Sequence, residues 1–139
     1  MKDFVVTEIF DSPRQEVWKA ITDHDQMIEW FFENIPNFRA EEGFHTKFLI
    51  ENEGRQFTHL WTITEVIPDK KIVYDWRYKE YPGIGKVTFE LSEKDNQTLL
   101  TLTNEGLESF PNDIDEFKEE SCRGGWNYFI NQRLKAYIK

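Results

Sequence analysis

The C-terminal segment from Asp113 to Lys139 constrains the fold more than any other part of the chain, because its pattern predicts one long helix. Asp113 and Glu116 have the spacing of a capping box. Acidic side chains crowd the first turns and basic side chains crowd the end, which matches the helix dipole. A helix of this length is about 40 Å long, enough to cross about six to eight strands. The rest of the chain is therefore expected to form a sheet that packs against it.

The apolar residues of this segment fall on one face at helical spacing. They are Cys122, Trp126, Phe129, Ile130, Leu134 and Tyr137. Gly124 and Gly125 interrupt the pattern, and each costs about 1 kcal/mol relative to Ala inside a helix. The sequence leaves two explanations for the pair open. One is the close approach of a strand or a bend in the helix, and the other is room for a ligand beside Trp126.

Composition limits the classes of partner. The chain has 139 residues, a net charge of −9 and an aromatic content of 16%. Residues 1–139 are expected to fold as a single domain. The negative net charge disfavours binding to nucleic acid and to anionic membrane surfaces, which need clustered Lys and Arg. No segment has the pattern of a signal peptide or of a membrane-inserting helix. The single cysteine excludes an intramolecular disulfide and fits a reducing compartment, so we expect a cytoplasmic protein.

The N-terminal region predicts one strand followed by two short helices. Phe4 to Phe10 is rich in β-branched and aromatic residues, as strands are. Pro13 then marks a helix start, because proline is favoured in the first turn. A second short helix is expected from Gln26 to about Phe32.

From Phe38 to Asn104 the apolar residues alternate with period two, and turn residues separate the runs. The expected strands are Phe38 to Glu41, Phe44 to Ile50, Gln56 to Ile67, Ile72 to Tyr78, Lys86 to Ser92 and Thr98 to Asn104. Pro82 to Gly85 is expected to be a loop. We predict an α+β fold in which a curved antiparallel sheet of about six to seven strands surrounds the long C-terminal helix. The first strand would join one edge of the sheet, and the two short helices would close one end.

Several short motifs, taken in order, carry a resemblance to a known family. They are Ser12-Pro13 leading into Glu16 to Asp23, Trp30-Phe31, Thr64 to Pro68, Lys71 to Trp76, Val87 to Leu91, Thr98 to Thr103, and Gly125-Trp126 with Leu134 and Tyr137-Ile138. The chain resembles the START-like (SRPBCC, helix-grip, birch-pollen-allergen-like) superfamily. Within it, the chain is most similar to the C-terminal domain of activators of heat-shock-protein-ninety ATPase and their homologues.

The resemblance implies a container, in which a curved sheet wraps a helix and an apolar cavity lies between them. Members of the superfamily bind lipids, sterols, flavonoids or polyketides, and a few catalyse cyclisation. One fold supports many functions, so the site has to be argued from its residues. The resemblance brings no catalytic residue set that can be placed on this sequence, and no cofactor is expected.

The aromatic residues on the expected inner faces form the candidate ligand site. Trp61, Trp76 and Trp126 are expected to stack on a ligand, while His59 and Tyr74 orient it through their polar atoms. The full set of candidate ligand-binding residues is Trp30, Phe31, Phe48, Phe57, His59, Trp61, Tyr74, Trp76, Tyr78, Trp126, Phe129 and Ile130. The expected partner is a hydrophobic small molecule such as a lipid, a flavonoid or a polyketide. A packed core without a cavity is the alternative.

Two other function classes stay open. A chaperone-associated interaction module would need an exposed face for a chaperone or another protein. An enzyme of the cyclase or dehydratase kind would need a titrating group in the cavity, for which His59 is the candidate. The sequence favours binding over catalysis, because no Ser or Cys motif has a paired base. Asp23-His24-Asp25 is not expected to bind a metal, since adjacent loop residues rarely converge on one ion. The oligomeric state stays open.

Overall fold

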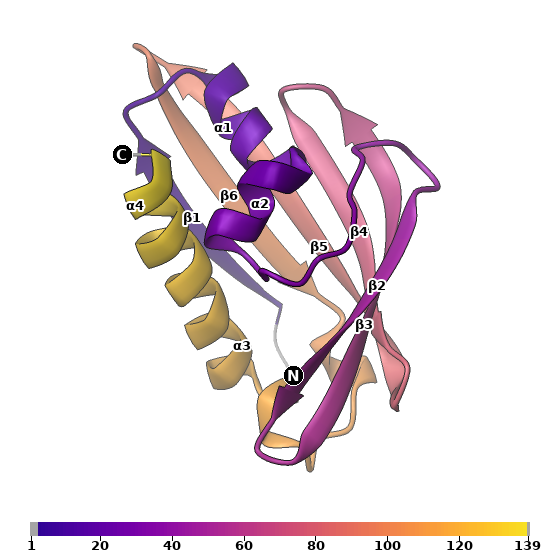
Figure 1. The fold of residues 1–139 in the computed structure, drawn as a ribbon. Helices are drawn as coiled ribbons and strands as arrows, with labels where there is room; N and C mark the ends of the chain where they lie inside the picture. Colours follow the sequence, from indigo (N-terminus) through magenta and orange to yellow (C-terminus); the bar gives the residue numbers. More distant parts are fainter. Residues whose placement is uncertain (1–2, 139) are drawn as a thin grey trace.

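The computed structural model describes residues 3–138, so the predicted helix end at Lys139 lies outside it (Figure 1). The strands are β1 (Phe4–Phe10), β2 (His45–Asn52), β3 (Arg55–Ile67), β4 (Lys71–Tyr78), β5 (Tyr81–Lys94) and β6 (Gln97–Glu105). The helices are α1 (Arg14–Thr22), α2 (His24–Trp30), α3 (Glu119–Trp126) and α4 (Lys135–Ile138), and η3 (Asn127–Leu134) is a π-helical stretch between the last two. The 3₁₀ turns η1 (Leu107–Ser109) and η2 (Asp115–Phe117) connect the sheet to α3.

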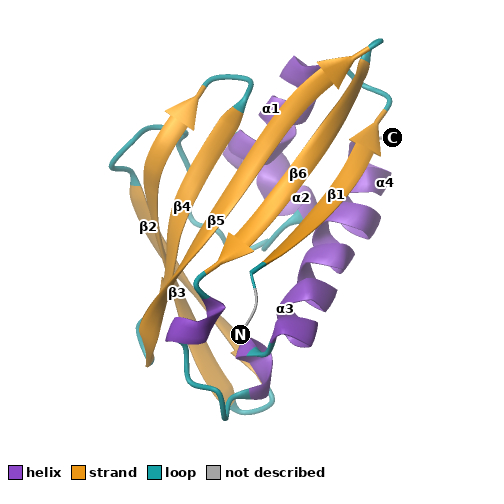
Figure 2. Ribbon diagram, turned by 180° about the vertical axis from the view of Figure 1, so that it is seen from behind, coloured by secondary structure: helices purple, strands orange, loops and turns teal. Residues whose placement is uncertain are grey.

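The sheet has six antiparallel strands in the order β1-β6-β5-β4-β3-β2. Hairpins join the strands from β2 to β6, and β1 pairs with β6, so the predicted return of the first strand to one edge is confirmed. The labelled helices lie on one face of the sheet and leave the other face uncovered (Figure 2). This one-sided packing explains the period-two pattern. Within residues 3–138, no helix is long and apolar enough to cross a membrane.

The segment from Phe38 to Glu41 forms no strand, so that prediction is wrong. The ring of Phe38 is buried instead against Tyr74, with ring centroids 5.7 Å apart. A turn follows, in which the N–H of Phe44 donates to the carbonyl of Glu41. The alternation in this part of the sequence marks one buried side chain, not a paired strand.

The segment from Pro82 to Gly85 lies inside β5, although its composition predicts a loop. Gly85 pairs with Trp76, and Tyr81 pairs with Tyr78. A bulge in the β4–β5 ladder takes up the register shift between these pairs, and bulges are sites where strands accept glycine. The hairpin turn falls just before β5, at residues 79–80.

The C-terminal helix begins at Glu119, not at Asp113. Glu116 does not cap this helix, because its carboxylate accepts hydrogen bonds from Arg55 (3.0 Å) and Asn52 (2.7 Å) of the β2–β3 hairpin. These bonds hold η2 as a separate turn against the hairpin. The predicted capping box is therefore wrong, and the helix starts more than one turn after Asp113.

The π-helical stretch changes which residues of the C-terminal helix are buried. In a π-helix each N–H bonds to the carbonyl five residues earlier, so one turn holds more residues than in an α-helix. Trp126, Ile130 and Leu134 are buried, and the partly buried Ile138 continues the same stripe. Tyr137 is 39% exposed, so its predicted place on the apolar face is wrong.

The C-terminal helix also covers the free edge of β1. Side chains of Arg123, Asn131 and Lys135 donate hydrogen bonds to backbone carbonyl oxygens of that strand. The acceptors are, in the same order, Val5 (3.4 Å), Thr7 (2.9 Å) and Ile9. An uncovered strand edge is a template for pairing with other chains, so this contact protects one side of the sheet.

Gly106 follows β6 and turns the chain toward η1, which leads into the region that closes the sheet near α3. Its φ angle is +82°, and a Cβ at this position would lie 2.7 Å from the backbone oxygen of Ile84. A side-chain rotation cannot relieve a contact with backbone, so this position requires glycine.

We predict that Gly106→Ala lowers the free energy of unfolding by about 2 kcal/mol or more, because the strain of a positive φ and the contact with Ile84 add together. Gly43→Ala is the matched control, since Gly43 has a φ of +88° but no atom within 4 Å of the added Cβ. The control should lose about 1 kcal/mol from backbone strain alone. Urea denaturation measures both losses, and equal values would contradict the role of the Ile84 contact.

Candidate functional site

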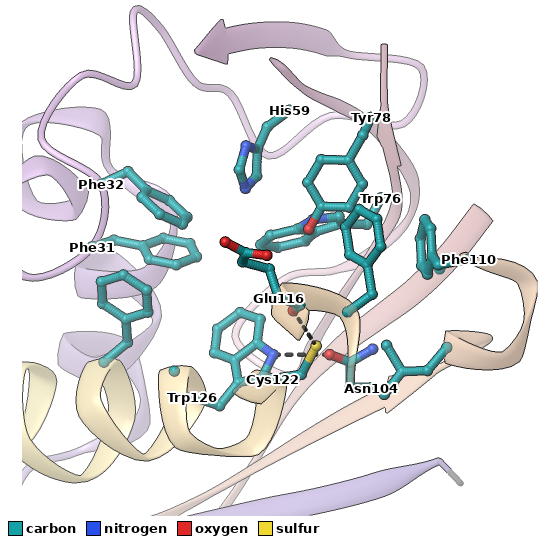
Figure 3. Close-up of a pocket in the computed structure, with 15 residues that line it drawn as sticks. Phe31, Phe32, His59, Trp76, Tyr78, Asn104, Phe110, Glu116, Cys122 and Trp126 are labelled. Carbon is teal, nitrogen blue, oxygen red and sulfur yellow. Dashed lines mark hydrogen bonds between the residues drawn. The ribbon is translucent and has the colours of Figure 1, made fainter. Parts of the chain in front are cut away.

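A cavity of about 200 Å³ lies between the inner face of the sheet and α3 (Figure 3). The segment after α2, strands β3 to β6, the η1–η2 region and the C-terminal helix all contribute to its wall. The lining residues are Phe31, Phe32, His59, Trp76, Tyr78, Gly85, Asn104, Leu107, Phe110, Glu116, Phe117, Cys122, Gly125, Trp126 and Phe129. Most of this wall is apolar, as in ligand pockets generally.

Aromatic rings from the end of α2, from β4 and from the C-terminal helix meet at the cavity. The ring centroid of Phe31 lies 5.6 Å from that of Trp126 and 6.5 Å from that of Trp76. The two indole rings are themselves 5.6 Å apart, and Phe129 lies edge-on to Phe31 at 5.0 Å. Large rigid rings in these orientations form a wall suited to an apolar or flat molecule.

His59 faces the cavity from β3 and is buried. Its Nδ1 lies 3.0 Å from the carbonyl oxygen of Phe57. A carbonyl can only accept, so Nδ1 carries the proton and Nε2 presents a lone pair. Burial lowers the pKa of His59 to about 4, and the Phe57 bond and the charge of Glu80 offset this effect only in part. The imidazole is therefore neutral near pH 7 and acts as a hydrogen-bond acceptor.

Tyr78 supplies the complementary donor from β4. Its hydroxyl oxygen accepts a hydrogen bond from the indole N–H of Trp76 at 2.8 Å, which leaves the hydroxyl proton to donate elsewhere. Burial raises the pKa of Tyr78, so the hydroxyl stays protonated. His59 and Tyr78 are opposite each other in the β3–β4 ladder, with ring centroids 4.9 Å apart. Figure 3 shows both rings at the same side of the cavity.

Asn104 and Cys122 add polar atoms near α3. The indole N–H of Trp126 donates to Oδ1 of Asn104 at 3.0 Å, which fixes the orientation of this indole. Burial raises the pKa of the Cys122 thiol to about 11, and its Sγ lies 3.5 Å from the carbonyl oxygen of Glu116. A thiol with so high a pKa is protonated at neutral pH and is a poor nucleophile.

Glu116 brings a carboxylate to the cavity wall, but its charge is paired. Arg55 and Asn52 both donate to it from the β2–β3 hairpin. Partial burial opposes its ionisation, yet the hydrogen bonds from Asn52 and the Arg55 guanidinium outweigh this effect and lower the pKa of Glu116. The same bonds tie η2 to the hairpin and hold this part of the wall in place.

The predicted ligand-binding residues fall into two groups in the structure. Those that line the cavity are Phe31, His59, Trp76, Tyr78, Trp126 and Phe129. Those that lie in the core outside the lining are Trp30, Phe48, Phe57, Trp61, Tyr74 and Ile130. Protein fills the space beside this second group, as the indole of Trp30 shows by donating to the Ala20 carbonyl of α1 at 2.7 Å. The packed-core alternative therefore describes the surroundings of Trp30, Trp61 and Tyr74. Phe48 and Phe57 instead pack behind the cavity wall, against His59 and Phe117.

Trp61 and Tyr74 lie in the packed core outside the cavity lining. Their rings lie edge to face with centroids 5.0 Å apart. Among residues 3–138, neither the indole nitrogen of Trp61 nor the hydroxyl of Tyr74 has a hydrogen-bond partner, although both atoms are buried. Since Tyr74 lies outside the cavity lining, the structure gives no support to its expected role in orienting a ligand.

Sequence reasoning missed part of the cavity wall. The lining residues outside the predicted set are Phe32, Gly85, Asn104, Leu107, Phe110, Glu116, Phe117, Cys122 and Gly125. Several of them belong to the acidic segment from Glu105 to Glu120, whose composition taken alone favours a solvated loop and a helix start. Leu107, Phe110 and Phe117 interrupt that acidic run and are buried. These apolar residues are the signal that could have identified the segment as part of the wall.

The two glycines of α3 have different surroundings. Gly125 lines the cavity, whereas Gly124 is exposed. A Cβ at either position would meet no atom within 4 Å, so the close approach of a strand does not explain the pair. The helix also continues through both residues. Of the explanations that the sequence left open, open space beside Trp126 is the one that this geometry supports.

Comparison with known proteins gives a family for this chain. The family model described as "Activator of Hsp90 ATPase homolog 1-like protein" matches residues 11–139. The human protein named "Activator of 90 kDa heat shock protein ATPase homolog 1" is 24% identical over 130 residues, which are 92% of this chain and 34% of that protein. The chain thus spans about a third of the length of this relative.

Solved structures share the fold. Protein CV1439 from Chromobacterium violaceum superposes with a TM-score of 0.80 at 21% identity, covering 98% of this chain and 96% of that chain. DynU16, described as a putative protein in the dynemicin biosynthetic locus, gives a TM-score of 0.76 at 22% identity, covering 99% of this chain and 47% of that chain. These similarities confirm the predicted helix-grip fold.

The buried Tyr74 and the partly buried Tyr78 should respond in opposite ways to loss of their hydroxyls. Tyr74→Phe is expected to leave the free energy of unfolding unchanged or to raise it by about 1 kcal/mol, because the lost hydroxyl has no partner. Tyr78→Phe should lower it by about 1–2 kcal/mol, because the indole N–H of Trp76 loses its acceptor. Denaturant titration of both variants provides the comparison. A larger loss in Tyr74→Phe would show that its hydroxyl has a partner in solution.

His59 should make the protein less stable in mild acid. The unfolded chain protonates a histidine below about pH 6.5, whereas the folded protein, with the pKa of His59 at about 4, does not bind that proton until lower pH. The unfolded state therefore binds more protons between these values, and acidification favours it. The free energy of unfolding should fall by about 2 kcal/mol from pH 6.5 to pH 5 on account of this residue.

Urea denaturation across that pH range measures the effect. His59→Gln should remove the fall in the free energy of unfolding that His59 causes between pH 6.5 and pH 5. His45→Gln, at an exposed position, should keep that fall because His59 is still present. A slope that His59→Gln does not change would contradict the burial of a neutral imidazole.

Proposed function

The chain belongs to the family of Activator of Hsp90 ATPase homolog 1-like proteins, and we propose that it binds a hydrophobic small molecule in the cavity between the sheet and α3. The observation that carries this proposal is the cavity itself, whose wall is built mainly from aromatic rings. Rings that only filled a core would close this space. Each 100 Å² of apolar ligand surface buried here would contribute about 2.5 kcal/mol before the entropic costs of association are subtracted.

The position of the cavity supports the same function. It lies beside Gly125, where the helix has no side chain, and Figure 3 shows its polar groups on the wall around it. Pockets of this kind combine an apolar lining with a few fixed hydrogen-bonding groups. A role for His59 in proton transfer fits less well, because a pKa of about 4 makes it a weak base near pH 7.

A chaperone-associated interaction module is the second candidate. The similarity to the human activator named above favours it, although this chain spans about a third of that protein. Binding of the purified protein to a ninety-kilodalton heat-shock chaperone, measured by calorimetry at low and high salt, tests this candidate. Salt-sensitive binding would support it, and no binding at low salt would remove it.

Native mass spectrometry tests the small-molecule proposal. The purified protein is measured alone and with a panel of fatty acids, flavonoids and aromatic polyketides. An added mass that is lost on denaturation would support the container function and would identify a ligand class. No adduct with any compound would contradict it.

We predict that Gly125→Leu abolishes ligand binding while the protein stays folded. The added side chain would occupy the cavity, and its Cβ meets no atom within 4 Å. Removing a glycine from a helix interior also stabilises the helix by about 1 kcal/mol. Gly124→Leu is the control, because Gly124 lies in the same helix, is equally free of close contacts and is exposed.

Binding of any ligand found in the panel is then compared between the two variants, with the thermal unfolding temperature measured alongside. Loss in Gly125→Leu alone would place the ligand beside α3. Equal binding by both variants would place it elsewhere.

A further inference from the structure

We propose that the ligand of this cavity is an uncharged compound of about one or two rings that carries a hydroxyl group, and that this hydroxyl is held between His59 and Tyr78. The inference rests on the proposed function, because it names the chemistry of the ligand for the same cavity. It comes from the charge of the wall, the arrangement of its polar atoms and its size.

The charge of the wall selects against anions. Within the described part of the chain, no lysine or arginine is among the residues that line the cavity. The one carboxylate there, that of Glu116, is already bonded to Arg55 and Asn52. A carboxylate ligand would enter an apolar site without a free positive partner, because Arg55 is already paired with Glu116. Burying an unpaired charge is costly, so acids such as fatty acids fit poorly.

The charge of the wall also gives no advantage to cations. Aromatic rings attract cations through their faces, and a carboxylate would add to this attraction if it were free. The guanidinium of Arg55 lies 3.0 Å from the carboxylate of Glu116 and neutralises it. An amine entering the cavity would therefore compete with an existing ion pair, whereas an uncharged ligand leaves that pair undisturbed.

His59 and Tyr78 offer an acceptor and a donor side by side. The Nδ1–H of His59 is held by the carbonyl of Phe57, which leaves Nε2 as an acceptor. The hydroxyl oxygen of Tyr78 accepts from Trp76, which leaves its proton as a donor. A ligand hydroxyl can donate to the first and accept from the second. The two residues are opposite neighbours in the β3–β4 ladder, their ring centroids lie 4.9 Å apart and both line the cavity. This proximity is the basis for assigning one ligand hydroxyl to both.

The size of the cavity limits the rest of the ligand. Its volume of about 200 Å³ is below the roughly 300–1,000 Å³ of pockets that hold drug-sized molecules. The surrounding rings pack against one another at 5.0–5.6 Å between centroids, which leaves little room for expansion. A compound of about one or two fused rings fits within these dimensions, whereas most of a long acyl chain or a sterol would lie outside them.

Three probes with the same ring system test the inference by isothermal titration calorimetry at pH 7. They are 2-naphthol, naphthalene and 2-naphthoate, which share two fused rings and differ in having a hydroxyl, no polar group or a negative charge. We expect 2-naphthol to bind most tightly, with naphthalene about tenfold or more weaker because two hydrogen bonds are lost. We expect 2-naphthoate to bind more weakly than naphthalene.

Two substitutions test whether Tyr78 and His59 cause the preference for 2-naphthol. Tyr78→Phe keeps the ring and removes the donor, and His59→Leu removes the acceptor at similar size. Each should weaken 2-naphthol about fivefold to tenfold and change naphthalene binding little. Tyr128→Phe is the control, because Tyr128 is exposed on the C-terminal helix and does not line the cavity. If a cavity variant fails to fold, the inference is tested by whether the wild-type protein binds 2-naphthol more tightly than naphthalene.

The outcomes separate this inference from the proposed function. Naphthalene binding as tightly as 2-naphthol, or 2-naphthoate binding as tightly as either, would overturn the inference and leave the container function standing. Tyr78→Phe and His59→Leu that both fold and keep the full preference for 2-naphthol would also overturn it. If none of the three probes binds, both the inference and the container function fail for ligands of this size.

Discussion

The contact between Trp126 and the inner face of the sheet fixes the C-terminal helix beside the cavity. Its indole ring lies 5.6 Å from Trp76 and 5.8 Å from Phe89, so it joins the C-terminal helix to neighbouring strands. Its N–H donates to Asn104 of β6, and this bond sets the angle of the ring. The cavity exists because a rigid ring fixed in this way cannot turn to fill the space next to it.

Different elements cover the inner face of the sheet at its two ends. At one end, α1, α2 and the ring of Phe38 cover the inner face, and Trp61 and Tyr74 are enclosed there even though their polar atoms have no partner within residues 3–138. At the other end, η1 and η2 cover the face through Phe110 and Phe117. The hydrogen bonds of Glu116 to the β2–β3 hairpin hold η1 and η2 in this position. The space left between them and the sheet is the cavity.

The general fold could be predicted because its signals are local. Alternation at Phe57, His59 and Trp61 identifies one face of a strand, and such patterns depend on near neighbours in the sequence. The position of the cavity could not be predicted in this way. It depends on Glu116 binding a hairpin 61 residues away. The burial pattern of the C-terminal helix was also missed, because the helix contains a π-helical stretch and the partly buried Ile138 takes the place of Tyr137 on its apolar stripe. A spacing of four residues between apolar positions fits both helix types, so the sequence alone does not distinguish them.

The contact between the C-terminal helix and β1 depends on side chains of the helix but on the backbone of the strand. Arg123, Asn131 and Lys135 bond to backbone carbonyls of the strand, and every residue type provides such a carbonyl. The outward side chains of β1, including Val5 and Ile9, are exposed. Substitution there leaves the acceptors in place, whereas substitution of a donor on the helix removes a bond. Substitutions on the outer surface of the strand therefore leave this edge contact intact, whereas substitutions of the three donors on the helix weaken it.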